Sequence, residues 1–283
     1  MSFLRSRREQ LRPEQVGLPS SGRRRTSGLR REELAALAGV SVEYLERLER
    51  GRDTNPSHAV LAALAEALQL SDSEKQHLAT LAMKRHSAAL LPPPRPVSDD
   101  TRPTVRTLLD HLDPTPASVF GPICNLVAWN SAWEAMVRPL GLLDEKSPNL
   151  IRYHFLNPMA RRIFAQSGWA DKADELVGWL RSAQPDWGSA DEFRALVDDL
   201  SVVPEFASRW AAHPVAACTR PSGTSFSHPD AGILNITTEV LLVAEAGQWL
   251  QVWVPADEGT ASAIKTFAHA TPPHRPIGGS APG

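Results

Sequence analysis

Apolar positions between Arg31 and Leu48 follow two short helices that are separated by a tight turn. Residues 31–48 read REELAALAGVSVEYLERL, and their apolar side chains recur at helical spacing on both sides of the turn. Gly39 permits the positive φ that such a turn uses, and Ser41 can cap the helix that follows. This pattern predicts a helix-turn-helix, a scaffold that places its second helix in the major groove of DNA.

The same periodicity predicts three more helices around this motif. The first covers about Phe3–Leu11. Another begins after Ser57, and the last begins at the capping box that Ser71 and Glu74 form. The N-terminal part is therefore predicted to be a compact all-helical module of five helices.

Strand-like patterns appear only in the second half of the chain. The apolar run Ala117–Asn130 predicts a hairpin or strand pair, and Leu150–His213 is mostly helical in pattern. Residues 222–255 favour strands that turn near Ala246-Gly247, and Gly259–His269 is predicted to be a closing helix. The fold class is thus mainly α in the first domain and α+β in the second, with an antiparallel sheet and flanking helices.

Proline positions divide the chain into parts. The run Pro92-Pro-Pro-Arg-Pro96 favours extended geometry and predicts a semi-rigid linker. The tail from Thr271 to Gly283 is rich in proline and glycine and is predicted to be disordered. The expected domains are a helix-turn-helix domain over 1–91, a linker over 92–103, a second domain over 104–270 and a tail over 271–283.

Charge is distributed unevenly between these parts. Through residue 91 there are 15 basic and 11 acidic side chains, and from residue 92 onward there are 15 basic and 21 acidic ones. A basic head on an acidic body fits an N-terminal module that binds double-stranded DNA and a C-terminal domain with another role. The sequence has only two cysteines, Cys124 and Cys218, which we expect to be reduced thiols and not ligands of a metal. Because the chain has no signal-peptide pattern and no apolar run of about 18 residues, we expect a cytoplasmic protein that does not enter a membrane.

The residues that read DNA are expected at the start of the second motif helix and in the basic segment before the motif. Arg47 could form a bidentate contact with guanine, and Glu43 could accept a hydrogen bond from cytosine. Arg30 and Arg31 stand at a helix start, where the helix dipole disfavours cations, so a phosphate is one explanation for them. A solvated charged face is the alternative explanation for this whole group. The expected DNA-binding residues are Arg23, Arg24, Arg25, Arg30, Arg31, Ser41, Val42, Glu43, Tyr44 and Arg47.

The chain as a whole, over about residues 1–268, resembles regulators of an actinobacterial type that join an XRE-type helix-turn-helix to a C-terminal MmyB-like, PAS-like domain. The segments that carry the resemblance are GLRREELAALAGVS (28–41), Tyr44, LERGR (48–52), VLAALA (60–65), LVAWN (126–130), NLIR (149–152), FLNP (155–158), Leu200-Ser201, PEF (204–206), Trp210, Gly223-Thr224 and His228-Pro229. The resemblance implies a lambda-repressor-like first domain and a PAS-like domain for dimerisation and ligand binding. It also implies an apolar pocket, for which a small hydrophobic, fatty-acid-like ligand is a plausible occupant.

The residue chemistry of the second domain is compatible with such a pocket. All eight tryptophans lie between residues 129 and 253, and aromatic side chains of this density can line an apolar site, although ordinary core packing explains them too. Arg152 could orient a carboxylate through bidentate hydrogen bonds, or it could bridge loops. The expected ligand-binding residues are Trp129, Trp133, Arg152, Phe155, Trp179, Phe226 and Trp253.

The sequence disfavours catalysis. It contains no P-loop, no GxSxG, no HExxH and no dinucleotide fingerprint, and its histidines are scattered. We therefore expect a transcription regulator without catalytic activity, cofactor or metal, which acts as a homodimer and senses a small hydrophobic molecule. The alternative is a DNA-binding regulator whose second domain serves only dimerisation or a protein partner.

Overall fold

The computed structural model of the chain describes residues 2–19, 28–52, 55–87, 97, 100–164, 168–212, 222–243 and 247–270. By proximity of Cα atoms the chain separates into two compact units, the first made of residues 1–94 with segments 177–188 and 207–217, and the second of the remaining residues. The predicted domain limits stay a prediction, and the proline run 92–96 and the tail 271–283 lie outside the described residues.

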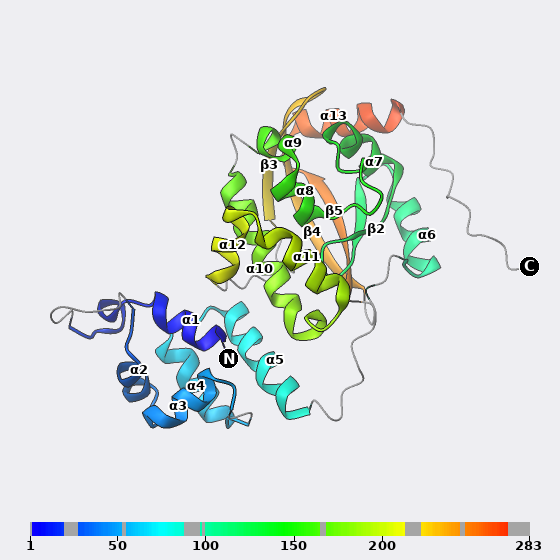
Figure 1. Cartoon of the computed structure of the whole chain (residues 1–283). Helices are drawn as coiled ribbons and strands as arrows, with labels where there is room; N and C mark the ends of the chain where they lie inside the picture. The colour runs from blue at the N-terminus through cyan, green and yellow to red at the C-terminus, as the bar shows by residue number, and fades with distance from the viewer. Residues whose placement is uncertain are drawn as a thin grey trace, which may run out of the picture. The chain divides into compact units, whose positions relative to one another are not determined.

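The N-terminal part consists of the predicted helices (Figure 1). Their bounds are α1 Ser2–Gln10, the 3-10 helix η1 Pro13–Val16, α2 Arg31–Leu37, α3 Val42–Glu49, α4 His58–Ala67 and α5 Asp72–Ser87. Leu34 and Ala35 of α2 pack with Leu45 and Leu48 of α3 in one buried core, to which α1, α4 and α5 also contribute. The small side chain of Ala35, only 1% exposed, suits the close approach of α2 and α3.

Local sequence signals set the ends of these helices. The Oγ atoms of Ser41 and Ser57 accept hydrogen bonds from backbone N–H groups three residues further on, at 3.1 and 3.3 Å. Ser71 and Glu74 form the reciprocal capping box, with distances of 2.7 and 3.4 Å. Gly39 has φ of +64° in the turn between α2 and α3, a conformation that side chains with a Cβ rarely adopt. The predicted caps and turn are therefore confirmed.

Between residues 103 and 270 a single antiparallel sheet is combined with helices (Figure 1). The strands are β1 Ala117–Phe120, β2 Leu126–Trp129, β3 Ser222–His228, β4 Gly232–Val243 and β5 Gln248–Pro255, and they lie side by side in the order β2-β1-β5-β4-β3. The helices are α6 Pro103–Leu112, α7 Ser131–Val137, the 3-10 helix η2 Arg138–Leu140, α8 Leu150–Leu156, α9 Pro158–Ile163, α10 Trp169–Trp187, α11 Asp191–Ser201, α12 Pro204–Ala211 and α13 Glu258–Ala270.

The two faces of the sheet have different partners. Helix α6, which the sequence analysis did not anticipate, packs Val105 and Leu109 against Val119 and Leu250 on one face. Trp253 points to the opposite face, because side chains alternate along β5. Helices α7, α8 and α9 carry side chains that meet this opposite face, and the candidate site lies there. Among the described helices, none is both long and apolar enough to span a membrane.

Asn130, which is 1% exposed, connects four segments of this second fold. Its Oδ1 accepts hydrogen bonds from the backbone N–H groups of Ala117 in β1 and Trp133 in α7, both at 3.0 Å. Its Nδ2 donates to the carbonyl oxygens of Thr115 at 2.8 Å and Leu109 at 3.3 Å. Two donors and two acceptor sites are what an amide side chain offers, so this buried group is fully satisfied.

His228 connects β3 to α7. Its Nδ1 accepts a hydrogen bond from the backbone N–H of Asp230 at 3.1 Å, so the ring proton resides on Nε2, which donates to the carbonyl oxygen of Met136 at 2.9 Å. Burial lowers the pKa of His228, and this effect outweighs the opposing influence of Met136 and Asp230. The folded protein therefore holds a neutral imidazole.

We expect acidification from about pH 7.5 to about pH 5.5 to lower the melting temperature of the native protein more than that of His228→Gln. The unfolded chain takes up a proton at His228 near its ordinary pKa of about 6.5, whereas the folded chain resists this uptake, so stability is lost as pH falls. Thermal unfolding at a series of pH values measures the difference. Parallel pH profiles for the two proteins would contradict this assignment.

Candidate functional site

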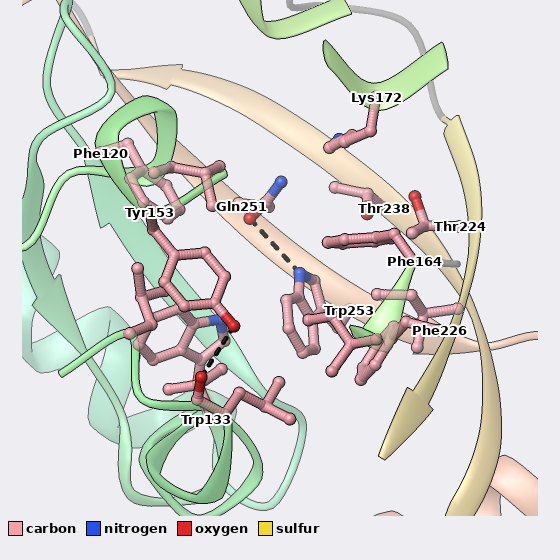
Figure 2. A pocket seen from close by; sticks show the side chains of 16 residues that line it. Phe120, Trp133, Tyr153, Phe164, Lys172, Thr224, Phe226, Thr238, Gln251 and Trp253 are labelled. Carbon is pink, nitrogen blue, oxygen red and sulfur yellow. Dashed lines mark hydrogen bonds between the residues drawn. The ribbon is translucent and has the colours of Figure 1, made fainter. Parts of the chain in front are cut away.

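A pocket lies between the sheet and the helices that cover its second face (Figure 2). It contains about 600 Å³ of space between atoms, including open solvent at its mouth, of which about 70 Å³ can hold the centres of water-sized molecules. Since one water needs only about 10–15 Å³ by the latter measure, the pocket has room for a slender small molecule. Sixteen side chains line it, and most of them are apolar.

Aromatic rings form much of the wall. The ring centroid of Trp133 lies 6.3 Å from that of Phe120 and 6.0 Å from that of Trp253. Phe226 continues the series, at 5.8 Å from Trp253 and 6.3 Å from Phe164. These spacings are typical of aromatic packing, and together the rings offer an apolar surface to an alkyl or aryl group.

Polar side chains occupy part of the same wall. Figure 2 shows Lys172, Thr224 and Thr238 gathered on one side, with Gln251 between them and Tyr153. The Lys172 ammonium lies 2.9 Å from a carboxylate oxygen of Glu175, one helical turn further along α10. The Tyr153 hydroxyl donates to the carbonyl oxygen of Leu140 at 2.7 Å, and burial raises the pKa of Tyr153, so the phenol stays protonated. The pocket thus combines one cation with several uncharged polar groups.

Three of the seven side chains predicted to bind ligand line this pocket, namely Trp133, Phe226 and Trp253. The other four are not among the sixteen that line it, and their role in binding stays a prediction. The structure places these four as follows: Trp129 Nε1 donates to Glu134 Oε2 at 3.0 Å, Arg152 forms an ion pair with Asp199, Phe155 packs edge-on against Phe206, and Trp179 is buried on α10.

Most of the polar side chains that line the pocket are not among the residues predicted to bind ligand. Gln251 had a usable signal, because it lies two residues from Trp249 and Trp253 and therefore shares their face of β5. Lys172 had no such signal in the sequence, because it belongs to a helix whose orientation depends on tertiary packing. Among the described residues no cluster of histidine, cysteine, aspartate and glutamate could hold a metal ion.

The residues predicted to read DNA lie mostly at the surface of the helix-turn-helix. Ser41, Glu43 and Arg47 are exposed, whereas Val42 and Tyr44 are half-buried and pack partly against the core. The guanidinium of Arg47 lies 5.4 Å from the ring centroid of Tyr44, a cation–π contact that steadies its position on α3. Arg30 is exposed, and Arg23, Arg24 and Arg25 lie outside the described residues.

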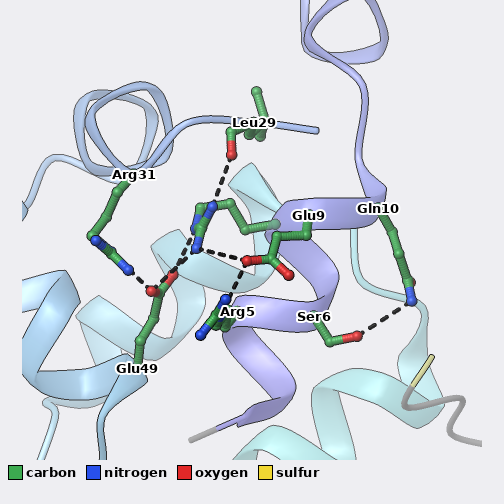
Figure 3. Close-up of polar contacts among 8 residues, drawn as sticks. Arg5, Ser6, Glu9, Gln10, Leu29, Arg31 and Glu49 are labelled. Atoms are coloured by element: carbon green, nitrogen blue, oxygen red, sulfur yellow. Dashed lines mark hydrogen bonds and ion pairs between the residues drawn. The ribbon is translucent and has the colours of Figure 1, made fainter. Parts of the chain in front are cut away.

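Arg31 participates in a buried ion network centred on Glu49, the last residue of α3 (Figure 3). Glu49, whose side chain is 2% exposed, accepts hydrogen bonds from Arg8 Nε at 2.6 Å and from Arg31 Nε at 2.9 Å. Arg8 also donates to the carbonyl oxygen of Leu29 at 3.0 Å. Burial alone would raise the pKa of Glu49, but the hydrogen bonds and charges of Arg8 and Arg31 outweigh it and lower the pKa. The cation at the start of α2 therefore has a partner inside the protein.

Comparisons with known proteins match both parts of the chain. A family model described as "MmyB-like transcription regulator ligand binding domain" matches residues 101–267, and one described as "Helix-turn-helix domain" matches residues 2–78. An uncharacterized HTH-type transcriptional regulator, y4dJ of Sinorhizobium fredii, is 46% identical over 59 residues, which make up 21% of this chain and 75% of that protein. The first match contains the pocket, and the second contains α2 and α3.

We expect Glu49→Gln to lower the free energy of unfolding of the helix-turn-helix region by about 2–4 kcal/mol, because it leaves the buried Arg8 with only the more distant, exposed Glu9 as a counter-charge, at 3.6 Å. Hydrogen exchange of amides in α2 and α3 within the full chain measures this local stability. The control is Glu46→Gln, which removes an exposed partner of Arg50 and should change stability by less than about 1 kcal/mol. Equal losses of stability in the two variants would show that the buried ion pairs of Glu49 stabilise the fold no more than an exposed ion pair does.

We expect Arg47→Ala to weaken binding to a selected DNA operator by about 1–3 kcal/mol and to affect random DNA less, because a contact with a base edge discriminates sequence. Arg50→Ala, which removes another exposed cation of the same segment, should weaken binding to both DNAs to a similar degree. Fluorescence anisotropy at fixed salt measures both affinities. An equal loss on both DNAs for Arg47→Ala would argue against base reading by this residue.

Proposed function

Because this chain belongs to the family of transcription regulators with an MmyB-like ligand-binding domain, we propose that its pocket binds a small fatty-acid-like amphiphile and that occupancy of the pocket changes its binding to DNA. The chain is a helix-turn-helix regulator that carries such a domain. The nature of the ligand and its effect on DNA binding are the parts that we propose. Its role is binding and not catalysis.

The observation that carries the proposal is the composition of the pocket wall. Apolar side chains, many of them aromatic, form most of it, and Lys172 is the one cation among its lining residues. An acyl chain would lie against Trp133, Trp253 and Phe226, where each buried methylene contributes about 0.8 kcal/mol. A carboxylate would lie near Lys172, whose present partner, Glu175, is partly exposed and can turn to solvent. The tail would then provide most of the affinity, and the head would set the orientation.

The output of this sensor would be the geometry of a dimer. One helix-turn-helix makes few base contacts, so we expect two copies on paired half-sites, as the motif commonly requires. A ligand that binds one arrangement of the dimer more tightly than another shifts the population toward it, and half-site spacing on DNA follows. The alternative, a second domain that only dimerises or binds a protein partner, predicts no response to such a ligand.

We expect dodecanoic acid to raise the melting temperature of the purified full chain, because a ligand that binds only the folded state stabilises it, by about 2.7 kcal/mol at a hundredfold excess over Kd. Lys172→Gln should weaken binding of the acid about tenfold and leave binding of its uncharged methyl ester nearly unchanged. The control is Lys265→Gln, an exposed cation on α13 that does not line the pocket. Calorimetric titration measures the affinities.

A gel shift with an operator, with and without dodecanoic acid, tests the link to DNA. A change in affinity supports regulation by the ligand. Binding of the acid without any change in DNA affinity would reject the regulatory part of the proposal. If neither the acid nor the ester binds, the alternative is favoured, in which the second domain only dimerises or binds a protein partner.

A further inference from the structure

The amide nitrogen of Gln251 is a hydrogen-bond donor that the protein leaves open toward the pocket. Gln251 is 5% exposed, and its Oε1 accepts a hydrogen bond from Trp253 Nε1 at 3.3 Å. That bond fixes the orientation of the amide, so Nε2 is directed away from Trp253 (Figure 2). Among the described residues, no acceptor takes the Nε2 hydrogens of Gln251. A donor that faces the pocket from a side chain this deeply buried can bond to an acceptor that enters with the ligand.

The polar groups that the sheet contributes to the pocket stand at separate positions on two neighbouring strands. Gln251 pairs across the strands with Val240, and Thr238 pairs with Trp253, so Gln251 and Thr238 are diagonal neighbours. Diagonal positions on adjacent strands are about 7–8 Å apart. A carboxylate that turns its two oxygens toward Lys172 and Thr238 presents no oxygen to the Gln251 amide. In that arrangement the Gln251 amide takes its acceptor from another part of the ligand.

A second unmet donor belongs to a residue of the pocket wall but is not open to the pocket. Trp133 is 1% exposed, and its buried indole nitrogen has no hydrogen-bond partner among the described residues. Figure 2 shows Trp133 on the side of the pocket away from Lys172, with Gln251 between the two. The indole nitrogen of Trp133 is enclosed by protein atoms, whereas the Gln251 amide lies along the wall that an acyl chain would cross, where a pure hydrocarbon chain would not satisfy it.

We propose that the pocket selects an amphiphile with two separated oxygen functions: an anionic end at Lys172 and Thr238, and an uncharged acceptor, a ketone or hydroxyl oxygen on the chain, that takes the hydrogen bond of Gln251. This inference rests on the proposed function, since it assumes that an acidic amphiphile enters the pocket. Gln251 is then the residue that determines specificity between oxidised and plain chains. Sites that hold a buried donor discriminate strongly against analogues that lack its acceptor.

The test compares dodecanoic acid with a set of twelve-carbon acids that carry one ketone at different positions. We expect the native full chain to bind at least one of these oxo acids about tenfold more tightly than dodecanoic acid. Gln251→Met keeps the length of the side chain and removes the amide, so it should bring that ratio to about one while the affinity for dodecanoic acid changes less than about threefold. Gln248→Met, the same substitution on the same strand but on the opposite face, should preserve the ratio.

The outcomes distinguish failure of the proposed function from failure of this inference. If neither dodecanoic acid nor any oxo acid binds, the proposed function fails. If dodecanoic acid binds and no oxo acid binds more tightly, or if the preference survives Gln251→Met, this inference is overturned and the proposed function stands. If Gln251→Met does not fold, an NMR titration of the native protein replaces it. An oxo acid should shift the side-chain amide proton resonance of Gln251 downfield, and dodecanoic acid should not.

Discussion

The buried amide of Asn130 is the contact on which the second fold depends. It holds the start of β1, the end of α6 and the first turn of α7 through four hydrogen bonds. Any shorter or apolar side chain would leave several backbone groups buried without partners, and each such group is costly. One of the bonded groups is the backbone N–H of Trp133, so the same amide that closes the fold also fixes an aromatic side of the pocket. Framework and site are therefore set by one residue.

Asn130 and Gln251 show two uses of the same chemical group. Asn130 has every donor and acceptor matched by the protein, which makes it structural. Gln251 has its oxygen matched by Trp253 and its nitrogen left open to the pocket, which makes it available to a ligand. Complete satisfaction of buried polar groups is the rule in folded proteins. The open nitrogen of Gln251, in a pocket lined by aromatic rings, is thus the group from which we infer the selectivity of the pocket.

The sequence carried the information that is local and lacked the information that is tertiary. Ser41 and Ser57 were predicted as caps because a cap acts on a backbone group three residues away. The four side chains Trp129, Arg152, Phe155 and Trp179 were chosen by residue type, and the structure places them outside the lining of the pocket. Lys172 lines the pocket because of the face that α10 turns toward the sheet. The residue pattern within the helix does not predict which face that is. The pairing of Arg31 with Glu49 is likewise a contact between distant positions.

The network around Glu49 has a consequence for how this scaffold can change its target. Exposed Ser41 caps α3, and Glu43 and Arg47 lie within its first two turns, while Glu49 anchors its last turn to α1 and α2. The side chains predicted to read DNA and the anchor are thus separated along one short helix. We therefore expect substitutions at the front of the helix to change the operator that is bound without loss of the fold, as long as the rear carboxylate and its two arginines are kept together.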